Sequence, residues 1–357
     1  MYSKTKIILG KTLSFKQNPM VDGLEGSYSF LDTGAVFIKN GVIEKVIDTQ
    51  GLNLPADAEI IDRKENLILA GFVDAHLHFP QTAIINSWGR RLIDWLNEYT
   101  FPEEGKFHDI GYALEIASRY FDICLSHGVT TSVSYGTIHP ESVDAFFTEA
   151  KARGLRALTG KTCMDRNAPS YLRDSAQASY DQSKTLIEKW HGVNRLGYVI
   201  TPRFSPTSTP EQMNALGALW KEYPDCLMQT HIGEQPEEVN WVKELFPTSK
   251  DYLDTYEESG LLGPRSVFGH GIYLTDREKS RIKEVNASLI HCPTSNTFIG
   301  SGLFDMKGLS RTGQKIGLAT DIGGGSSFSM LKVMATAYEI AQLRGHALHP
   351  ADLLWLS

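Results

Sequence analysis

The order of apolar and polar positions divides the chain near residue 65. Before it, short apolar alternations predict the β-strands KIILG, GAVFIKNGVIEKVID and AEIID, and Asn40 with Gly41 indicates a tight hairpin turn. After it, apolar runs alternate with amphipathic helical segments, which is typical of βα units around a parallel sheet. We therefore expect residues 1–65 to form a small β-domain and residues 66–357 a larger α/β domain.

Eight apolar runs in the second region are candidate strands. They are LILAGFVDAHLH (67–78), GVTTSVSYG (128–136), RALTGKTCMD (156–165), GYVITPRFSP (197–206), CLMQTHIGE (226–234), SVFGHGIYL (266–274), ASLIHCPTSN (287–296) and KIGLATDIGG (315–324). Helical patterns such as PESVDAFFTEAKARG and TPEQMNALGALWKEY separate them, opened by Pro or Thr in capping positions. Eight strands with helical crossovers predict a (β/α)8 barrel of the TIM type. The final HPADLLWLS starts a helix at Pro350 that stops after about two turns without a cap, so we expect a truncated C-terminus.

Composition narrows the class of protein. Hydrophobic residues make up 41% and charged residues 22% of the 357 residues, as in ordinary soluble globular proteins. A formal charge of −7 offers no electrostatic footprint for nucleic acid or an anionic membrane, and no run approaches the roughly 20 apolar residues of a membrane helix. The four cysteines are scattered without a CxxC pair, which favours a reducing, cytoplasmic setting over a disulfide framework or a thiolate zinc site.

The candidate chemistry lies at the strand ends, where TIM-type barrels carry their active sites. In HLH, His76 and His78 stand two apart in a strand and project to the same side, as two neutral ligands for zinc or iron would. This pair alone does not decide between a metal site and hydrogen-bonded core histidines. His231 and Asp321 end the fifth and eighth candidate strands and complete a set of three nitrogens and one carboxylate, with room for a water as in hydrolytic sites.

Further ionisable residues follow the same strand ends. Glu234 comes three residues after His231, within reach of a metal-bound water as a proton shuttle; as a mere helix N-terminal charge it is less well placed than its neighbours Glu237 and Glu238. His270 ends the sixth strand and is expected to orient the water or stabilise developing charge, the alternative being a purely supporting histidine. His291 ends the seventh strand. Lys161 is expected to be an ordinary barrel residue, so a single metal is predicted.

The segments GFVDAHLHFPQ, TPRFSPT, QTHIGEQPEE, VFGHGIYL, SLIHCPTSN and LATDIGGGSSFSML together resemble the amidohydrolase superfamily, in particular its guanine deaminase family. The resemblance implies His76, His78, His231 and Asp321 as zinc ligands and Glu234 as the proton shuttle. It implies His270 and Asp321 as the residues that hold and activate the water. Gln81, Arg203 and Phe204, together with the ligand His231, would bind the purine. It also implies a homodimer, and a β-sandwich begun by the N-terminal strands and completed by strands after the barrel, which are missing from this chain.

The function expected from the resemblance is zinc-dependent hydrolysis of guanine to xanthine and ammonia, by a hydrolase acting on C–N bonds of cyclic amidines. An Arg donor fork, a Gln amide and an aromatic face suit the polar edge and ring of guanine. Two alternatives stay open at this point. One is another aminohydrolase of the superfamily, acting on a triazine, a pterin or a different purine, and the other is a non-catalytic scaffold that keeps only the barrel.

Overall fold

The computed structural model describes residues 5–89 and 91–357, and the chain divides into two compact units. One unit comprises Met1–Gly71 with Pro350–Trp355, and the other comprises Phe72–His349 with Leu356–Ser357. Residues 1–4 of the expected β-domain lie outside the described residues.

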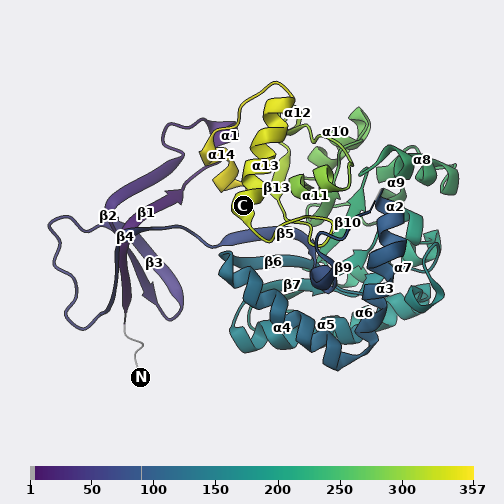
Figure 1. The fold of residues 1–357 in the computed structure, drawn as a ribbon, viewed down its shortest axis with the longest axis horizontal. Helices are drawn as coiled ribbons and strands as arrows, with labels where there is room; N and C mark the ends of the chain where they lie inside the picture. Colours follow the sequence, from purple (N-terminus) through teal and green to yellow (C-terminus); the bar gives the residue numbers. More distant parts are fainter. Residues whose placement is uncertain (1–4, 90) are drawn as a thin grey trace. The chain divides into compact units, whose positions relative to one another are not determined.

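The smaller unit is built on a four-stranded sheet with the order β3-β2-β1-β4 (Figure 1). Its elements are β1 Lys6–Phe15, α1 Pro19–Asp22, β2 Tyr28–Lys39, β3 Val42–Asp48, β4 Glu59–Ile68 and α14 Pro350–Trp355. β2 and β3 form the predicted hairpin, because Asn40 and Gly41 both adopt the left-handed conformation that such a two-residue turn requires (φ 52° and 77°). The helix predicted from Pro350 is α14, whose Trp355 ring packs edge-on to Phe15 at 6.0 Å.

The end of β4 differs from the expected domain boundary at residue 65. Leu67 and Ile68 pair with Lys11 and Thr12 of β1, and the first barrel strand begins only at Phe72. The apolar run that was assigned to one strand therefore covers the end of β4 and the start of the next strand. Hydrophobicity alone carries no mark of this break, because both strands are apolar there.

The larger unit contains the predicted barrel of eight parallel strands, which follow one another in chain order. They are β5 Phe72–His78, β6 Val129–Tyr135, β7 Arg156–Gly160, β9 Leu196–Pro202, β10 Leu227–Ile232, β11 Ser266–His270, β12 Ser288–His291 and β13 Lys315–Leu318, and the short β8 Thr162–Cys163 pairs with β9. Each lies within or overlaps one predicted run, so the (β/α)8 prediction is confirmed.

The barrel closes where the residues after β13 meet β5. The Asp321 N–H donates to the His76 carbonyl at 2.9 Å, and the Thr320 N–H donates to Asp74 Oδ1 at 3.0 Å. Asp74 is buried at this seam, and burial raises the pKa of its carboxyl to about 7. Closure of the barrel thus places Asp321 beside His76.

Helices alternate with the strands, and Figure 1 shows α4 and α5 on the outer side of β6 and β7. The helices of this unit are α2 Leu92–Trp95, α3 Phe101–Glu104, α4 Ile110–Ser126, α5 Pro140–Arg153, α6 Ala176–Trp190, α7 Pro210–Glu222, α8 Pro236–Leu245, α9 Tyr252–Glu257, α10 Asp276–Glu284, α11 Pro293–Phe298, α12 Met306–Arg311 and α13 Met330–Leu343. The predicted caps are present: Thr209 accepts from the Gln212 N–H at the start of α7, and Pro occupies the first turn of α5, α7 and α8. Within the described residues, no helix has the length and apolar character needed to cross a membrane.

A helical segment between β5 and α4 was not predicted. It consists of η1 Phe79–Ile84, α2, the π-helical turn η2 Leu96–Thr100, α3 and η3 Gly105–His108. Its apolar side chains form one buried cluster with residues from later βα loops, made up of Leu92, Trp95, Leu96, Phe101, Ile138, Met164, Leu172 and Ile299. This cluster holds the segment against the loops at the C-terminal ends of the strands.

Candidate active site

A cavity lies at the C-terminal ends of the barrel strands. Its lining combines polar and ionisable side chains with an apolar wall from the segment between β5 and α4. The lining residues are His78, Gln81, Leu92, Trp95, Leu96, Arg203, Phe204, His231, Glu234, His270, Ile299, Asp321 and Gly324. Of the predicted site residues, only His76 does not line the cavity, and it lies next to Asp321, which does.

Three histidines and one aspartate converge at one end of this cavity. His78 Nε2 and His231 Nε2 are 3.1 Å apart, and Asp321 Oδ1 lies 3.5 Å from His76 Nε2 and 3.6 Å from His78 Nε2. One ligand atom from each of the four residues lies within 4.8 Å of the other three. Strands β5 and β10 and the residues after β13 thus bring together the set predicted from the sequence.

The hydrogen bonding of these histidines suits a metal ion. His231 Nδ1 lies 2.7 Å from the Arg203 carbonyl oxygen and donates to it, which leaves the Nε2 lone pair free. Both ring nitrogens of His76 and Nδ1 of His78 are buried without a hydrogen-bond partner in the described part of the chain. Burial lowers the pKa of all three imidazoles, so they are neutral. Neutral, unpartnered nitrogens beside a carboxylate fit a divalent metal ion.

Asp321 is held in a strained backbone conformation, with a φ of 50° that non-glycine residues rarely adopt. Burial alone would raise the pKa of its carboxyl. The neighbouring imidazoles of His76, His270 and His231 outweigh burial and lower this pKa to about 2. Asp321 is therefore an anion at neutral pH and supplies the negative charge of the ligand set.

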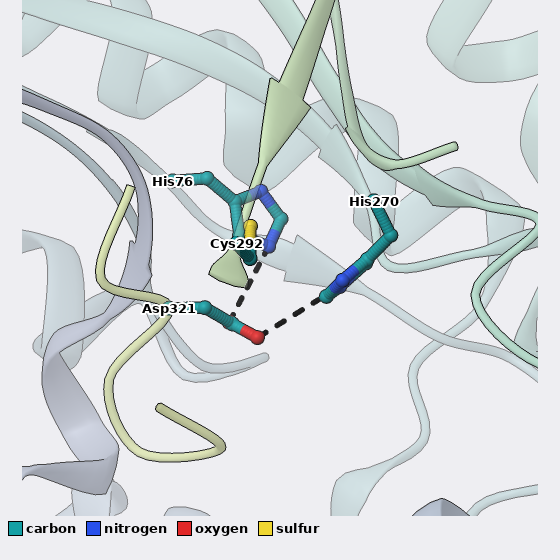
Figure 2. Close-up of side chains that lie close together, drawn as sticks. All are labelled: His76, His270, Cys292 and Asp321. Atoms are coloured by element: carbon teal, nitrogen blue, oxygen red, sulfur yellow. Dashed lines mark ion pairs between the residues drawn. The ribbon is translucent and has the colours of Figure 1, made fainter. Parts of the chain in front are cut away.

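Figure 2 shows the Asp321 carboxylate facing both His76 and His270. His270 Nε2 lies 3.8 Å from Asp321 Oδ2 and 3.5 Å from Glu234 Oε2, while its Nδ1 donates to Asn296 Oδ1 at 2.9 Å. Burial opposes protonation of His270, but the carboxylates of Glu234 and Asp321 outweigh it and raise its pKa. A protonated His270 can stabilise negative charge that develops between these two carboxylates.

Cys292 is drawn next to His76 in Figure 2 and forms a second possible ligand group with His76, His270 and Asp321. Burial raises the pKa of its thiol, so the protonated form dominates. The side chain packs in an apolar cluster with Val267 and Ala319. The group of three histidines and Asp321 is therefore the better set of ligands.

Glu234 projects into the cavity from the loop between β10 and α8. Its Oε1 accepts a hydrogen bond from the Ser301 hydroxyl at 2.8 Å, and its backbone N–H donates to Glu238 Oε2 at 2.8 Å. Burial raises the pKa of the Glu234 carboxyl to about 7. A carboxyl with such a pKa can take up and release a proton at neutral pH.

The other end of the cavity carries Gln81, Arg203 and Phe204. Arg203 Nη1 donates to both carboxylate oxygens of Glu104, at 3.0 and 2.8 Å, and Gln81 Nε2 donates to Glu104 Oε1 at 2.8 Å. The Gly323 N–H donates to Gln81 Oε1 at 3.0 Å. The predicted purine-binding side chains therefore share a carboxylate that the sequence did not reveal.

Comparison with known proteins identifies the family to which this chain belongs. The model of the amidohydrolase family matches residues 67–356. The chain belongs to the amidohydrolase family.

Within the amidohydrolases, the chain is similar to guanine deaminases. It is 42% identical to the guanine deaminase of Escherichia coli strain K12 over 92% of this chain and 75% of that protein. The solved structure of E. coli guanine deaminase superposes with a TM-score of 0.96 at 40% identity, over 98% of this chain and 82% of that one. The guanine deaminase of C. acetobutylicum, solved with guanine bound in its active site, gives a TM-score of 0.92 at 29% identity, over 99% of this chain and 85% of that one.

Two residues considered in the sequence lie outside the cavity lining of this amidohydrolase. The His291 ring stacks on Phe304 at 4.5 Å, and burial lowers its pKa to about 3, so it is a neutral core residue. Lys161 forms a buried ion pair with Asp174, which also accepts from Gln212. Both residues contribute to the packing of the barrel rather than to the cavity.

Sequence reasoning missed Glu104, Ser301 and Asn296, which bond to Arg203, Glu234 and His270 respectively. Glu104 and Ser301 lie outside the predicted strands, and Asn296, although it ends the seventh predicted run, was not singled out as a site residue. Glu104 could have been suspected on physical grounds alone. A buried Arg203 needs a negative partner, and the two carboxylates of PEEGKF were candidates.

Proposed function

We propose that this chain is a guanine deaminase that converts guanine and water to xanthine and ammonia. One observation carries the proposal: a single cavity unites a divalent-metal ligand set, a carboxyl whose pKa is about 7, and a donor-rich edge made by Gln81 and Arg203. The similarity to guanine deaminases supports the same substrate.

The metal is proposed to be one zinc ion per subunit, with iron as the alternative, held by His76, His78, His231 and Asp321. Three imidazoles and one carboxylate are ligands that zinc accepts while leaving a position for water. When bound, zinc lowers the pKa of a coordinated water toward about 7 and so makes a nucleophile available at neutral pH.

The protein groups around this position would move the protons of the reaction. As water adds to C2 of guanine, Asp321 takes up one of its protons, and Glu234 delivers a proton to N3. Glu234, left as a carboxylate, receives the proton that Asp321 took up and passes it to the 2-amino group, which leaves as ammonia when the C2–N bond breaks. The proton of the C2 hydroxyl then returns Glu234 to its acid form as the C2 carbonyl of xanthine forms. His270, 3.5 Å from Glu234 and 3.8 Å from Asp321, would stabilise the negative charge of the tetrahedral intermediate.

The orientation of guanine follows from the two ends of the cavity. With C2 at the ligand set, the O6 and N7 acceptors on the opposite side of the purine face Arg203 and Gln81. A guanidinium matches these two acceptors as a bidentate donor. Phe204, buried at the same end and 6.5 Å from the Trp241 ring, offers an aromatic surface to the purine.

We further propose a homodimer in the cytoplasm. The buried free thiols of all four cysteines are consistent with a reducing compartment. Light scattering of the purified protein would test the oligomeric state directly.

The test of the function is ammonia release. The metal-loaded protein is incubated with guanine, and with adenine, cytosine, a pterin and a triazine as controls. Ammonia from guanine alone supports the proposal, and preference for a pterin or triazine would replace it by another aminohydrolase activity. A protein that binds neither zinc nor iron would favour the non-catalytic alternative.

A further inference from the structure

Glu104 occupies an unusual position for a carboxylate. Its side chain is fully buried at the end of α3, yet it accepts from both purine-binding residues, Arg203 and Gln81. It lies 99 residues from Arg203 in the chain and belongs to none of the strands that form the metal end of the cavity. Phe101, one turn earlier on α3, packs its ring 5.7 Å from the Arg203 guanidinium.

The hydrogen bonds around Gln81 fix the direction of its amide. Its Oε1 accepts from the backbone N–H of Gly323, and its Nε2 donates to Glu104. A flipped amide would set its Nε2 against the Gly323 N–H and its Oε1 against the Glu104 carboxylate, so both contacts would become repulsive. The second hydrogen on Gln81 Nε2 can therefore be donated to a ligand.

Arg203 is constrained in a similar way. Both contacts with Glu104 use Nη1, so the Nε and Nη2 donors remain for a ligand. Glu104 also balances the guanidinium charge, because the ion pair is buried and water screens it little. The result is an edge rich in donors that carries no net charge.

We infer that Glu104 is a positioning residue that makes the cavity select a neutral 6-oxopurine. It locks Gln81 and Arg203 as donors toward O6 and N7, and it cancels the charge that would otherwise attract an anionic ligand. This inference rests on the proposed function for the identity of the ligand. It has a consequence for turnover: xanthine ionises more readily than guanine, so an uncharged edge does not retain the product as an anion.

The test compares Glu104→Gln and Glu104→Asp with Glu103→Gln as a matched control. Glu103 is the preceding residue of α3 and is also buried, but its carboxylate bonds to Lys106 and Tyr112 away from the cavity. Hypoxanthine is the probe for binding, because it has the 6-oxo edge but no 2-amino group to lose. Its dissociation constant is measured by calorimetry on the zinc-loaded protein, beside KM and kcat for guanine and inhibition by xanthine.

Glu104→Gln is expected to weaken hypoxanthine binding and to raise KM for guanine by about tenfold or more, since one donor contact becomes repulsive. Its kcat should fall by a smaller factor, and zinc content should stay at the wild-type value. At alkaline pH, inhibition by xanthine should strengthen relative to hypoxanthine binding, because the guanidinium charge is no longer balanced. Glu103→Gln should change none of these quantities.

Glu104→Asp keeps the charge but shortens the side chain. Glu104→Asp should weaken hypoxanthine binding and leave the ratio of xanthine to hypoxanthine affinity unchanged. If Glu104→Gln does not fold, Glu104→Asp alone tests the positioning role of Glu104. Hypoxanthine affinity within about threefold of wild type in Glu104→Asp, or equal losses in Glu103→Gln, would overturn the inference. Failure of the proposed function looks different, because the wild-type protein itself would then release no ammonia from guanine.

Discussion

The two ends of the active-site cavity are constructed differently. At the end proposed to bind metal, His76 and His78 lie on β5, His231 lies on β10 and Asp321 follows β13, so the barrel sets the spacing of these four residues. At the purine end, Arg203 and Gln81 depend on Glu104, which a helical segment between β5 and α4 brings in. In the proposed mechanism, the barrel therefore positions the groups that carry out the reaction, while the helical segment between β5 and α4 positions the side chains that select the ligand.

Removal of the metal should have the largest effect, and it should affect catalysis far more than purine binding. Dialysis against a chelator should abolish ammonia release, and stoichiometric zinc should restore it, because no other described group near C2 can supply the nucleophile. Hypoxanthine binding should survive in part, since the purine end needs no metal. Metal analysis and calorimetry on the same samples provide the measurement, and full activity after chelation would contradict the metal assignment.

Glu234→Gln should impair catalysis while metal binding and purine binding stay intact. Loss of the proton shuttle is expected to lower kcat by about 10²–10⁴-fold, with zinc content and hypoxanthine affinity unchanged. Glu237→Gln, on the exposed side of the first turn of α8, is the matched control. Substantial remaining turnover in Glu234→Gln would remove Glu234 from the mechanism.

Arg203→Lys tests the purine end. Lysine keeps the charge but loses the planar fork, so kcat/KM for guanine should fall by about 10–100-fold, mainly through KM. Arg166→Lys, which stacks over Phe246 outside the cavity lining, should leave kinetics unchanged. Equal losses for substrates without a 6-oxo group would argue against the orientation proposed for guanine.

Gly269→Ala tests how tightly the barrel fixes the metal end. A Cβ at Gly269 would lie 2.4 Å from Cε1 of His76, so the ring must shift. We expect zinc affinity to fall by about tenfold, as measured by competition with a chelator. Gly111→Ala, on an exposed position of α4, is the control, and unchanged zinc affinity in Gly269→Ala would show that the His76 position tolerates displacement.

Ser301→Ala should give the smallest effect, a fall in kcat of a few-fold. The Ser301 hydroxyl donates to the Glu234 carboxylate and thereby lowers its pKa, so its removal should raise that pKa further above the ordinary value. Since the protonated carboxyl delivers the proton, the alkaline limb of the pH profile of kcat/KM should move to higher pH. Ser310→Ala, whose hydroxyl bonds to a backbone carbonyl on α12, serves as control, and a shift to lower pH would contradict the proton-donor role.

The difference between the two ends of the cavity also explains which site residues could be predicted from the sequence. His76, His78, His231 and Asp321 could be proposed because strand periodicity determines the direction of a side chain and the barrel determines where strand ends meet. Glu104, Ser301 and Asn296 lie in short helices or loops, where direction depends on tertiary packing that no local pattern encodes. The end of β4 at Ile68 was not predicted for a related reason. A single apolar run contains parts of two strands that belong to different units.

Closure of the barrel at Asp321 also has a consequence for biosynthesis. The hydrogen bond from Asp321 to His76 joins the residues after the last barrel strand to the first strand, and the proposed ligands His76, His78 and Asp321 lie at the same seam. In a nascent chain, the three proposed histidine ligands therefore leave the ribosome before Asp321 does. Metal bound early would be held by histidines alone, and the arrival of Asp321 would complete both the cylinder and the coordination shell in one step.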